Sequence, residues 1–139
     1  MTYCFLDRLI WWYNISMTNE ELINKAKSIA ITKQVAEETV VGEIGAALIT
    51  DKGNLYTGVS IHAPSGLGFC GEASAMAAMV TNGESRIKTI VASDGQGNIY
   101  RPCGRCREMI RQINKQNMDT EIILKEKIVT LTDLLPYPY

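Results

Sequence analysis

The chain has 139 residues and a mass of 15.4 kDa, which is the size of one globular domain with a core of its own. Its 46% hydrophobic and 21% charged residues exclude the disordered and fibrous classes, and a formal net charge of -1 lacks the positive field that binds nucleic acid non-specifically. No apolar run approaches the roughly 20 residues of a membrane helix, so we expect a globular domain with neither a nucleic-acid nor a membrane partner.

The first sixteen residues differ in composition from the rest of the chain. They hold five of the ten aromatic residues and both tryptophans. Asp7 and Arg8 interrupt this segment and no small-residue cleavage site follows, so we reject a secretory signal. Three interpretations stay open: a start assigned too early with Met17 as the true initiator, an added helix, or an interfacial membrane anchor. We expect an extra leader over 1–16, a single domain over 17–139 and, without an export signal, a cytoplasmic location.

Helix and strand patterns follow one another after this leader. The capping-box pattern Thr18-Asn-Glu-Glu21 predicts a helix over 18–34, whose apolar residues form one stripe. Two β-branched segments, 43–50 and 55–61, flank the turn-forming Asp51-Lys-Gly-Asn54. These segments are expected to pair antiparallel as a hairpin.

The second half of the chain continues the alternation. A stretch rich in Ala and Met predicts a helix over 70–80, closed by Asn82-Gly83. The further elements, in chain order, are a strand over 87–93, a loop over 94–98, a helix over 103–115, a strand over 120–124 and a short helix over 131–136. This order indicates a mixed sheet between helices, a three-layer α/β/α fold.

Three of the four cysteines occur where helices are expected to begin. Cys103 and Cys106 bracket the first turn of one helix and lie on one face of it, and Cys70 opens another helix. A helix N-terminus carries about +0.5 of a charge, which favours the thiolate that binds metal. The three cysteines therefore predict a zinc site, in which Glu72, two residues after Cys70, is the expected catalytic carboxylate. Arg105 or Arg107 would offset the excess negative charge.

Other interpretations of these cysteines stay open. Cys103 and Cys106 alone could form a thioredoxin-like redox pair, although such a pair is expected without a third core cysteine. A structural disulfide is a less favoured interpretation, because a chain without an export signal meets a reducing cytosol. The serious rival is a non-catalytic protein with a closed structural zinc site, in which His62, the only histidine, joins the three thiolates. An open site with water as fourth ligand is the preferred prediction, although a carboxylate such as Glu72 in a first helical turn often only complements the dipole.

The pattern of cysteines and glutamate resembles a known family. Cys70-Gly-Glu72 with Pro102-Cys-x-x-Cys106 is similar to the C-x-E and P-C-x-x-C signature of the zinc nucleobase deaminases, in which the glutamate is not a metal ligand. The resemblance runs from about Met17 to the end of the chain. Four further motifs look like the small, tetrameric cytidine deaminases, the second and third of them most like blasticidin S deaminases: Gly45-Ala-Ala-Leu48, Tyr56-Thr-Gly-Val59, Pro102-Cys-Gly-Arg-Cys-Arg107 and Leu134-Leu-Pro136.

The resemblance implies a fold, an assembly and a reaction. The fold is a mixed five-stranded sheet with helices on both faces, so one more short strand is expected around Ile128-Val129. The assembly is a homotetramer whose active sites are completed by neighbouring subunits. The reaction is the hydrolytic deamination of a cytosine-type aminopyrimidine nucleoside (cytidine, deoxycytidine or a blasticidin S-like compound) with release of ammonia. Zinc held by Cys70, Cys103 and Cys106 would activate water, and Glu72 would move the protons.

Three positions depart from the family pattern. Where the family has G-x-N-x-E to hold a ribose, this chain has Gly58-Val-Ser-Ile-His62. The segment before Gly45, Val40-Val-Gly42, lacks the usual aromatic residue, and Gly71 replaces a common alanine. Arg101 or Arg105 is the expected contact for a carboxylate on the substrate. The predicted substrate contacts are Ser60, His62, Phe69, Gly71 and Arg101.

Overall fold

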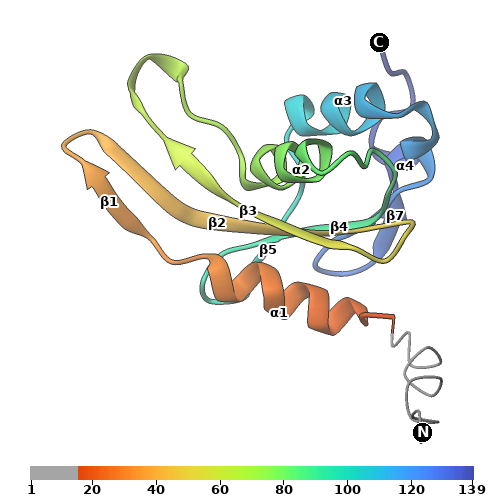
Figure 1. Ribbon diagram of the computed structural model, residues 1–139, viewed down its shortest axis with the longest axis horizontal. Helices are drawn as coiled ribbons and strands as arrows, with labels where there is room; N and C mark the ends of the chain where they lie inside the picture. The colour runs from red at the N-terminus through yellow and green to blue at the C-terminus, as the bar shows by residue number, and fades with distance from the viewer. Residues whose placement is uncertain (1–15) are drawn as a thin grey trace, which may run out of the picture.

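The computed structural model describes residues 16–139, which form a mixed sheet with helices on both faces (Figure 1). The strands are β1 (Lys33–Ala36), β2 (Thr39–Thr50), β3 (Leu55–His62), β4 (Ile87–Ser93), β5 (Ile99–Tyr100), β6 (Glu121–Ile123) and β7 (Ile128–Thr130). The helices are α1 (Asn19–Ile29), α2 (Gly71–Thr81), α3 (Gly104–Ile113) and α4 (Leu131–Leu134), with short 3-10 turns η2 (Pro64–Gly66) and η3 (Lys115–Asp119). None of the helices in this part of the chain is long and apolar enough to cross a membrane.

The order of the strands confirms the three-layer prediction. β2 lies between β3 and β4 and is antiparallel to both, β4 pairs parallel with β6, and β6 pairs antiparallel with β7. These five strands are the predicted ones, including the short strand expected around Ile128-Val129. β1 and β5 bring the sheet to seven strands, so the expected number of five was too low.

Both unpredicted strands lack the pattern that identifies a strand in a sequence. All four residues of β1 are exposed, so no alternation of apolar and polar residues marks it, and β5 has only two residues. β1 also explains why α1 ends at Ile29, five residues before the predicted end at 34. Residues 33–36 pair with the start of β2 instead of continuing the helix.

Alternation along the strands divides the core between the two faces of the sheet. In β2, Ala47 points toward α1, where Leu22 and Ala26 are buried, whereas Ala46 and Leu48 point toward α2 and α3. α1 therefore covers one face, and α2, α3 and α4 cover the other (Figure 1). α1 begins at the predicted capping box, which is present with both of its hydrogen bonds.

Two close approaches fix α2 against β3. A side chain at Gly58 would place its Cβ 2.3 Å from the backbone nitrogen of Ala75, so only glycine lets the helix pack this close to the strand. At the far end of α2, the Tyr56 hydroxyl donates to the Glu84 carboxylate at 2.6 Å. These contacts hold the helix whose first turn carries Cys70 and Glu72.

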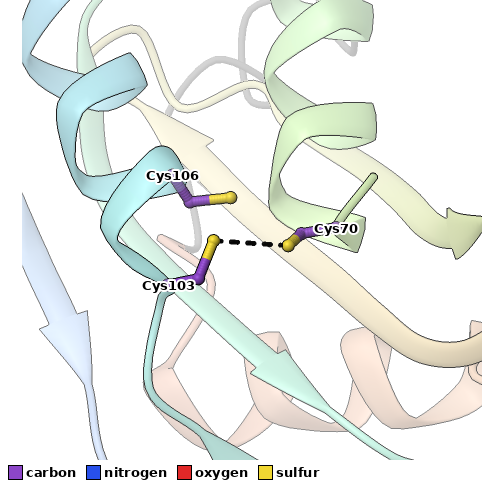
Figure 2. A group of neighbouring side chains, drawn as sticks. All are labelled: Cys70, Cys103 and Cys106. Carbon is purple, nitrogen blue, oxygen red and sulfur yellow. Dashed lines mark hydrogen bonds between the residues drawn. The ribbon is translucent and has the colours of Figure 1, made fainter. Parts of the chain in front are cut away.

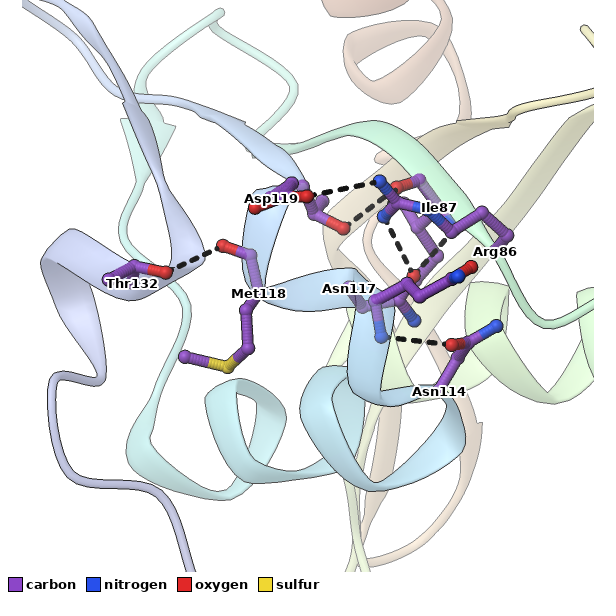
Figure 3. Close-up of polar contacts among 9 residues, drawn as sticks. Arg86, Ile87, Asn114, Asn117, Met118, Asp119 and Thr132 are labelled. Carbon is purple, nitrogen blue, oxygen red and sulfur yellow. Dashed lines mark hydrogen bonds and ion pairs between the residues drawn. The ribbon is translucent and has the colours of Figure 1, made fainter.

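A buried asparagine holds the other end of α3. The Asn117 side chain accepts hydrogen bonds from the Ile87 backbone N–H at 2.9 Å and from the Arg86 guanidinium at 3.2 Å (Figure 3). Its amide donates to the carbonyl oxygens of Ser85 and Ile110, both at 2.9 Å. Asn117 is fully buried, so these four hydrogen bonds join α3 and η3 firmly to the start of β4.

The connection from β3 to α2 closes on itself before the helix begins. Ile61 and Phe69 exchange two backbone hydrogen bonds of 2.9 Å each, which join the two ends of the arm formed by residues 62–68. A Cβ at Gly68 would lie 2.1 Å from the Ile61 oxygen, so this bridge requires glycine beside it. The chain then enters α2 directly through Cys70.

Candidate metal centre and active site

The three predicted cysteines meet where α2 and α3 begin (Figure 2). Cys70 is the N-cap of α2, Cys103 is the N-cap of α3, and Cys106 lies in the first turn of α3. The sulfur atoms of Cys70 and Cys103 are 3.4 Å apart, and all three sulfurs lie within 4.8 Å of one another. Zinc with four tetrahedral ligands and Zn–S bonds of about 2.3 Å needs sulfurs about 3.8 Å apart. The cluster therefore fits one zinc ion.

The chemistry of the thiols also fits a dication. Burial, followed by the hydrogen bond with Cys103, raises the pKa of the Cys70 thiol. Burial and the negative charges of Glu72, Cys70 and Cys103 raise the pKa of Cys106. Burial opposes ionisation of Cys103 too, but hydrogen bonds from the Cys106 backbone and from the other two thiols bring its pKa below the ordinary value. Ionisation is therefore easiest at Cys103, and a cation beside the cluster would favour the thiolate form of all three cysteines.

Glu72 lies beside the cluster and not in it. It is the second residue of α2 and only 5% exposed, and it lines the same cavity as Cys70 and Cys103. Burial raises the pKa of the Glu72 carboxyl, whereas a hydrogen bond from its own backbone N–H lowers it. The carboxyl group is thus held away from bulk solvent at the wall of the cavity.

The cavity has a volume of about 460 Å³ and opens at the carboxyl end of β3. Cys70, Cys103 and Glu72 are among the residues that line it. The structure brings all five predicted substrate contacts to its wall, namely Ser60, His62, Phe69, Gly71 and Arg101.

The histidine is held away from the sulfur cluster. His62 is 64% exposed, and its Nδ1 atom pairs with the Glu43 carboxylate at 2.5 Å. Among residues 16–139, the group of potential metal ligands that includes the cysteines contains no histidine. The structure therefore favours an open three-cysteine site over the closed site with His62 as fourth ligand.

The Ser60 side chain is hydrogen-bonded to the backbone of β2 at the wall of the cavity. It is 3% exposed, and its hydroxyl accepts a hydrogen bond from the Ile44 N–H at 3.0 Å. This bond lies where the register between β2 and β3 shifts, between Val41 and Gly45. The serine thereby shapes the wall to which Ile44 contributes, and its hydroxyl hydrogen stays available to a ligand.

The arginines near the cluster differ in what they contact. Arg107 donates from Nε to the Pro102 oxygen at 2.8 Å and from a terminal nitrogen to the Leu134 oxygen at 3.1 Å. Its guanidinium thus joins α3 to the end of α4, which is a structural use that the proposed charge compensation did not anticipate. Arg101 lines the cavity, whereas Arg105 lies on a separate groove along α3.

The structure adds two residues to the site that the sequence did not indicate. Glu43 contacts His62 because the shift in register near Gly42 brings β2 and the end of β3 together. Tyr100 lines the cavity from β5. The alternation of Ile99 and Tyr100 is the only signal that could have indicated it, and two residues are too few to establish a period.

Known proteins resemble this chain over most of its length. Residues 16–120 match the family model described as "Cytidine and deoxycytidylate deaminase zinc-binding region". A cytidine deaminase of Mycobacterium tuberculosis is 31% identical over 96 residues, which are 67% of this chain and 69% of that protein. A blasticidin-S deaminase of Bacillus cereus is 32% identical over 138 residues, covering 91% of this chain and 96% of the relative.

Solved structures give the same result for the fold. The crystal structure of a cytidine deaminase from Mycobacterium tuberculosis matches with a TM-score of 0.73 and 27% identity, over 86% of this chain and 95% of that one. A cytidine deaminase from Burkholderia pseudomallei matches with a TM-score of 0.71 and 25% identity, over 88% of this chain and 100% of that one.

Proposed function

Because this chain belongs to the cytidine and deoxycytidylate deaminase family, whose zinc-dependent members deaminate cytosine nucleosides, we propose a part for each residue of its site in that reaction. The chain is an aminohydrolase with a zinc cofactor. We assign the zinc to Cys70, Cys103 and Cys106 and the proton transfers to Glu72. The observation that carries this assignment is the meeting of three thiols at two helix N-termini, next to a buried carboxyl group in one cavity.

Glu72 performs the acid and base steps. Zinc, when bound, supplies the Lewis acidity that makes water nucleophilic at neutral pH. The Glu72 carboxylate accepts a proton from the attacking water and passes it to the ring nitrogen next to the carbon that bears the amino group. It then takes the second proton from the hydroxyl group added to the ring carbon and delivers it to the amine as the C–N bond breaks, so that water and the aminopyrimidine become the oxopyrimidine and ammonia. One carboxyl group can serve both steps because it lines the cavity together with Cys70 and Cys103.

Five residues of the cavity wall bind the rest of the substrate in this proposal. Phe69 offers an apolar surface, and Ser60 and His62 stand where the sugar would lie. Gly71 has no side chain and leaves the first turn of α2 open, because a Cβ there would approach the Ile44 oxygen to 3.0 Å. Arg101 offers a guanidinium to a carboxylate on the substrate.

The substrate preference follows from positions 60 and 62. A site built to hydrogen-bond a sugar hydroxyl discriminates strongly against ligands that lack it, and this chain lacks the Asn and Glu that the family uses. We therefore expect low kcat/KM for cytidine and deoxycytidine and a higher value for blasticidin S. The measurement is ammonia release from the three compounds with one zinc-loaded preparation.

The Arg101→Gln variant sharpens this test. It is expected to lower kcat/KM for blasticidin S by roughly tenfold and to leave cytidine unchanged. Lys115→Gln, an exposed cation outside the cavity, is the matched control. A kcat/KM for cytidine of about 10⁴ M⁻¹s⁻¹ or more, above the other two substrates, would refute the assignment of Ser60 and His62.

We further propose a homotetramer located in the cytoplasm. Two arms extend past the sheet, the β1–β2 hairpin and residues 62–68 (Figure 1), and they carry the exposed apolar residues Val35 and Leu67. In this proposal the two side chains contact neighbouring subunits. The three free thiols of the site suit a reducing compartment. Light scattering is expected to give four times the 15.4 kDa mass of the chain, and the mass of one chain would contradict the proposal.

A further inference from the structure

We propose that Tyr100 is a specificity-determining residue, whose aromatic ring packs against the pyrimidine ring of the substrate, and that Asp94 is its positioning residue. This inference rests on the proposed function of the cavity and adds to it a residue outside the family signature.

The register of β5 places the Tyr100 side chain on the same face of the sheet as the metal centre. Tyr100 pairs with Ala92 of β4, and Ile99 pairs with Ser93. Ile99 packs into the cluster beneath α1, so the next side chain along the strand points to the opposite face. Ala92 packs on that face with α2 and α3. Because a cross-strand neighbour shares the face of its partner, the side chain of Tyr100 lies on the same face of the sheet as that of Ala92.

Tyr100 borders the reaction site itself. It lines the cavity together with Phe69, Cys103 and Glu72. Tyr100 and Glu72 also share the wall of a small void of about 10 Å³ beneath it. These two observations place the Tyr100 ring close to Glu72, the proposed proton carrier. In the sequence, Tyr100 precedes Cys103, a proposed zinc ligand, by three residues.

The ring offers a surface that a flat ligand can cover. Tyr100 is 46% exposed, and Phe69 is the other aromatic residue of the cavity wall in the described part of the chain. The segment that precedes Gly45 offers only Val40-Val-Gly42, without an aromatic side chain. Stacking on an aromatic ring tolerates differences between bases, because each base has a π face. Tyr100 thus supplies an aromatic surface from β5.

Asp94 fixes the outer end of the ring. The Tyr100 hydroxyl donates to Asp94 Oδ2 at 3.1 Å. The same carboxylate accepts from the backbone N–H groups of Gln96 and Asn98, both at 2.9 Å, and from the Asn98 side chain at 2.8 Å. These hydrogen bonds, the Asn98 side chain first among them, hold the pKa of Asp94 below its ordinary value, although burial opposes them. The tyrosine is therefore attached to an anchor that is itself fixed by three hydrogen bonds.

Uridine, the product of cytidine deamination, tests this inference by binding alone. Its dissociation constant is measured by calorimetry with the full-length, zinc-loaded wild type and with Tyr100→Leu, Tyr100→Phe, Tyr100→Trp and Asp94→Asn. Tyr100→Leu is expected to weaken uridine binding and to raise KM for cytidine by roughly 5- to 100-fold, with kcat changed by no more than about threefold. Tyr100→Trp keeps a stacking surface and is expected to bind within about threefold of wild type.

The remaining variants separate the ring from its hydroxyl. Tyr100→Phe and Asp94→Asn remove one positioning hydrogen bond and are expected to weaken binding by no more than about fivefold. Tyr137→Leu changes a tyrosine that is 93% exposed and outside the cavity, and should bind uridine as the wild type does. Zinc content and mass in light scattering are measured for each variant and are expected to be unchanged.

Several results would overturn the inference. Uridine binding of wild-type strength in Tyr100→Leu would show that the ring contacts no substrate. If Tyr100→Leu does not fold, a Tyr100→Trp protein that binds uridine about 100-fold more weakly than the wild type would contradict the proposal that a stacking surface at this position binds the pyrimidine ring. Loss of tetramer mass together with binding would show that the ring contacts another subunit instead. A wild type that binds uridine but releases no ammonia from any cytosine nucleoside would refute the proposed function, while the comparison between variants still decides the part of Tyr100.

Discussion

Replacing Glu72 by glutamine is expected to lower kcat for ammonia release by at least about 100-fold, while the protein keeps its fold and its zinc. The amide retains the shape of the side chain but cannot accept a proton from water or return one to the amine. Because Glu72 is 5% exposed, the neutral amide removes the cost of burying a charge, so the melting temperature should not fall. Steady-state kinetics, metal analysis and thermal unfolding of one preparation measure the three quantities.

Glu37→Gln is the matched control for this substitution. Glu37 is exposed in the turn between β1 and β2, and does not line the cavity. Its kcat should equal that of the wild type. Undiminished ammonia release in Glu72→Gln would remove Glu72 from the mechanism and leave the proton transfers to another group.

A Cys106→Ser protein is expected to lose its zinc and all measurable deaminase activity. Cys106 is fully buried, and its sulfur is one of three within 4.8 Å. A serine hydroxyl does not ionise to replace the thiolate, so only two cysteine ligands remain. Metal analysis after dialysis should find less than about one zinc per two chains, because metal affinity depends on each deprotonated ligand.

The same substitution should lower the melting temperature. Zinc binds the folded state, so its loss removes the stabilisation that binding adds, about 4 kcal/mol at a thousandfold excess over Kd. Wild type stripped of zinc by a chelator should melt near the temperature of Cys106→Ser. Cys4→Ser, a cysteine that the family signature does not include, should keep its zinc. Full zinc occupancy in Cys106→Ser would show that the ligand set has been assigned wrongly.

The parts of the cysteine cluster could be predicted from the sequence because local rules place each cysteine on its helix. Cys103 and Cys106 share one helix face by spacing alone, and Cys70 begins a helix that the Ala and Met residues after it predict. The meeting of the two helix ends is a tertiary event, and it was expected because three cysteines at two helix starts suit one metal ion. The predicted ends of α2 and α3 lie within two residues of the observed ends, because the same local patterns determine them.

The wall of the cavity could not be predicted, because it depends on pairing between distant strands. Glu43 reaches His62 at the shift in register between β2 and β3, and Gly42, whose φ is +78°, lies within that shift. Tyr100 enters the site because β5 pairs with the end of β4, and a two-residue strand carries no readable period. Arg107 looked like a counter-charge, yet its hydrogen bonds to carbonyl oxygens appear only in three dimensions.

The bridge between Ile61 and Phe69 separates the arm that follows β3 from the first turn of α2, so the arm can be engineered on its own. Because its two hydrogen bonds close the arm at its base and Gly68 is kept beside them, we expect that residues 62–67 can be exchanged or lengthened without moving the first turn of α2. The closure entropy of a flexible loop rises by only about 0.6 kcal/mol for each doubling of its length, which is small beside the stability of a domain. Libraries of new arms grafted between Ile61 and Gly68 would therefore vary which nucleosides enter, while the residues that carry out the chemistry stay in register.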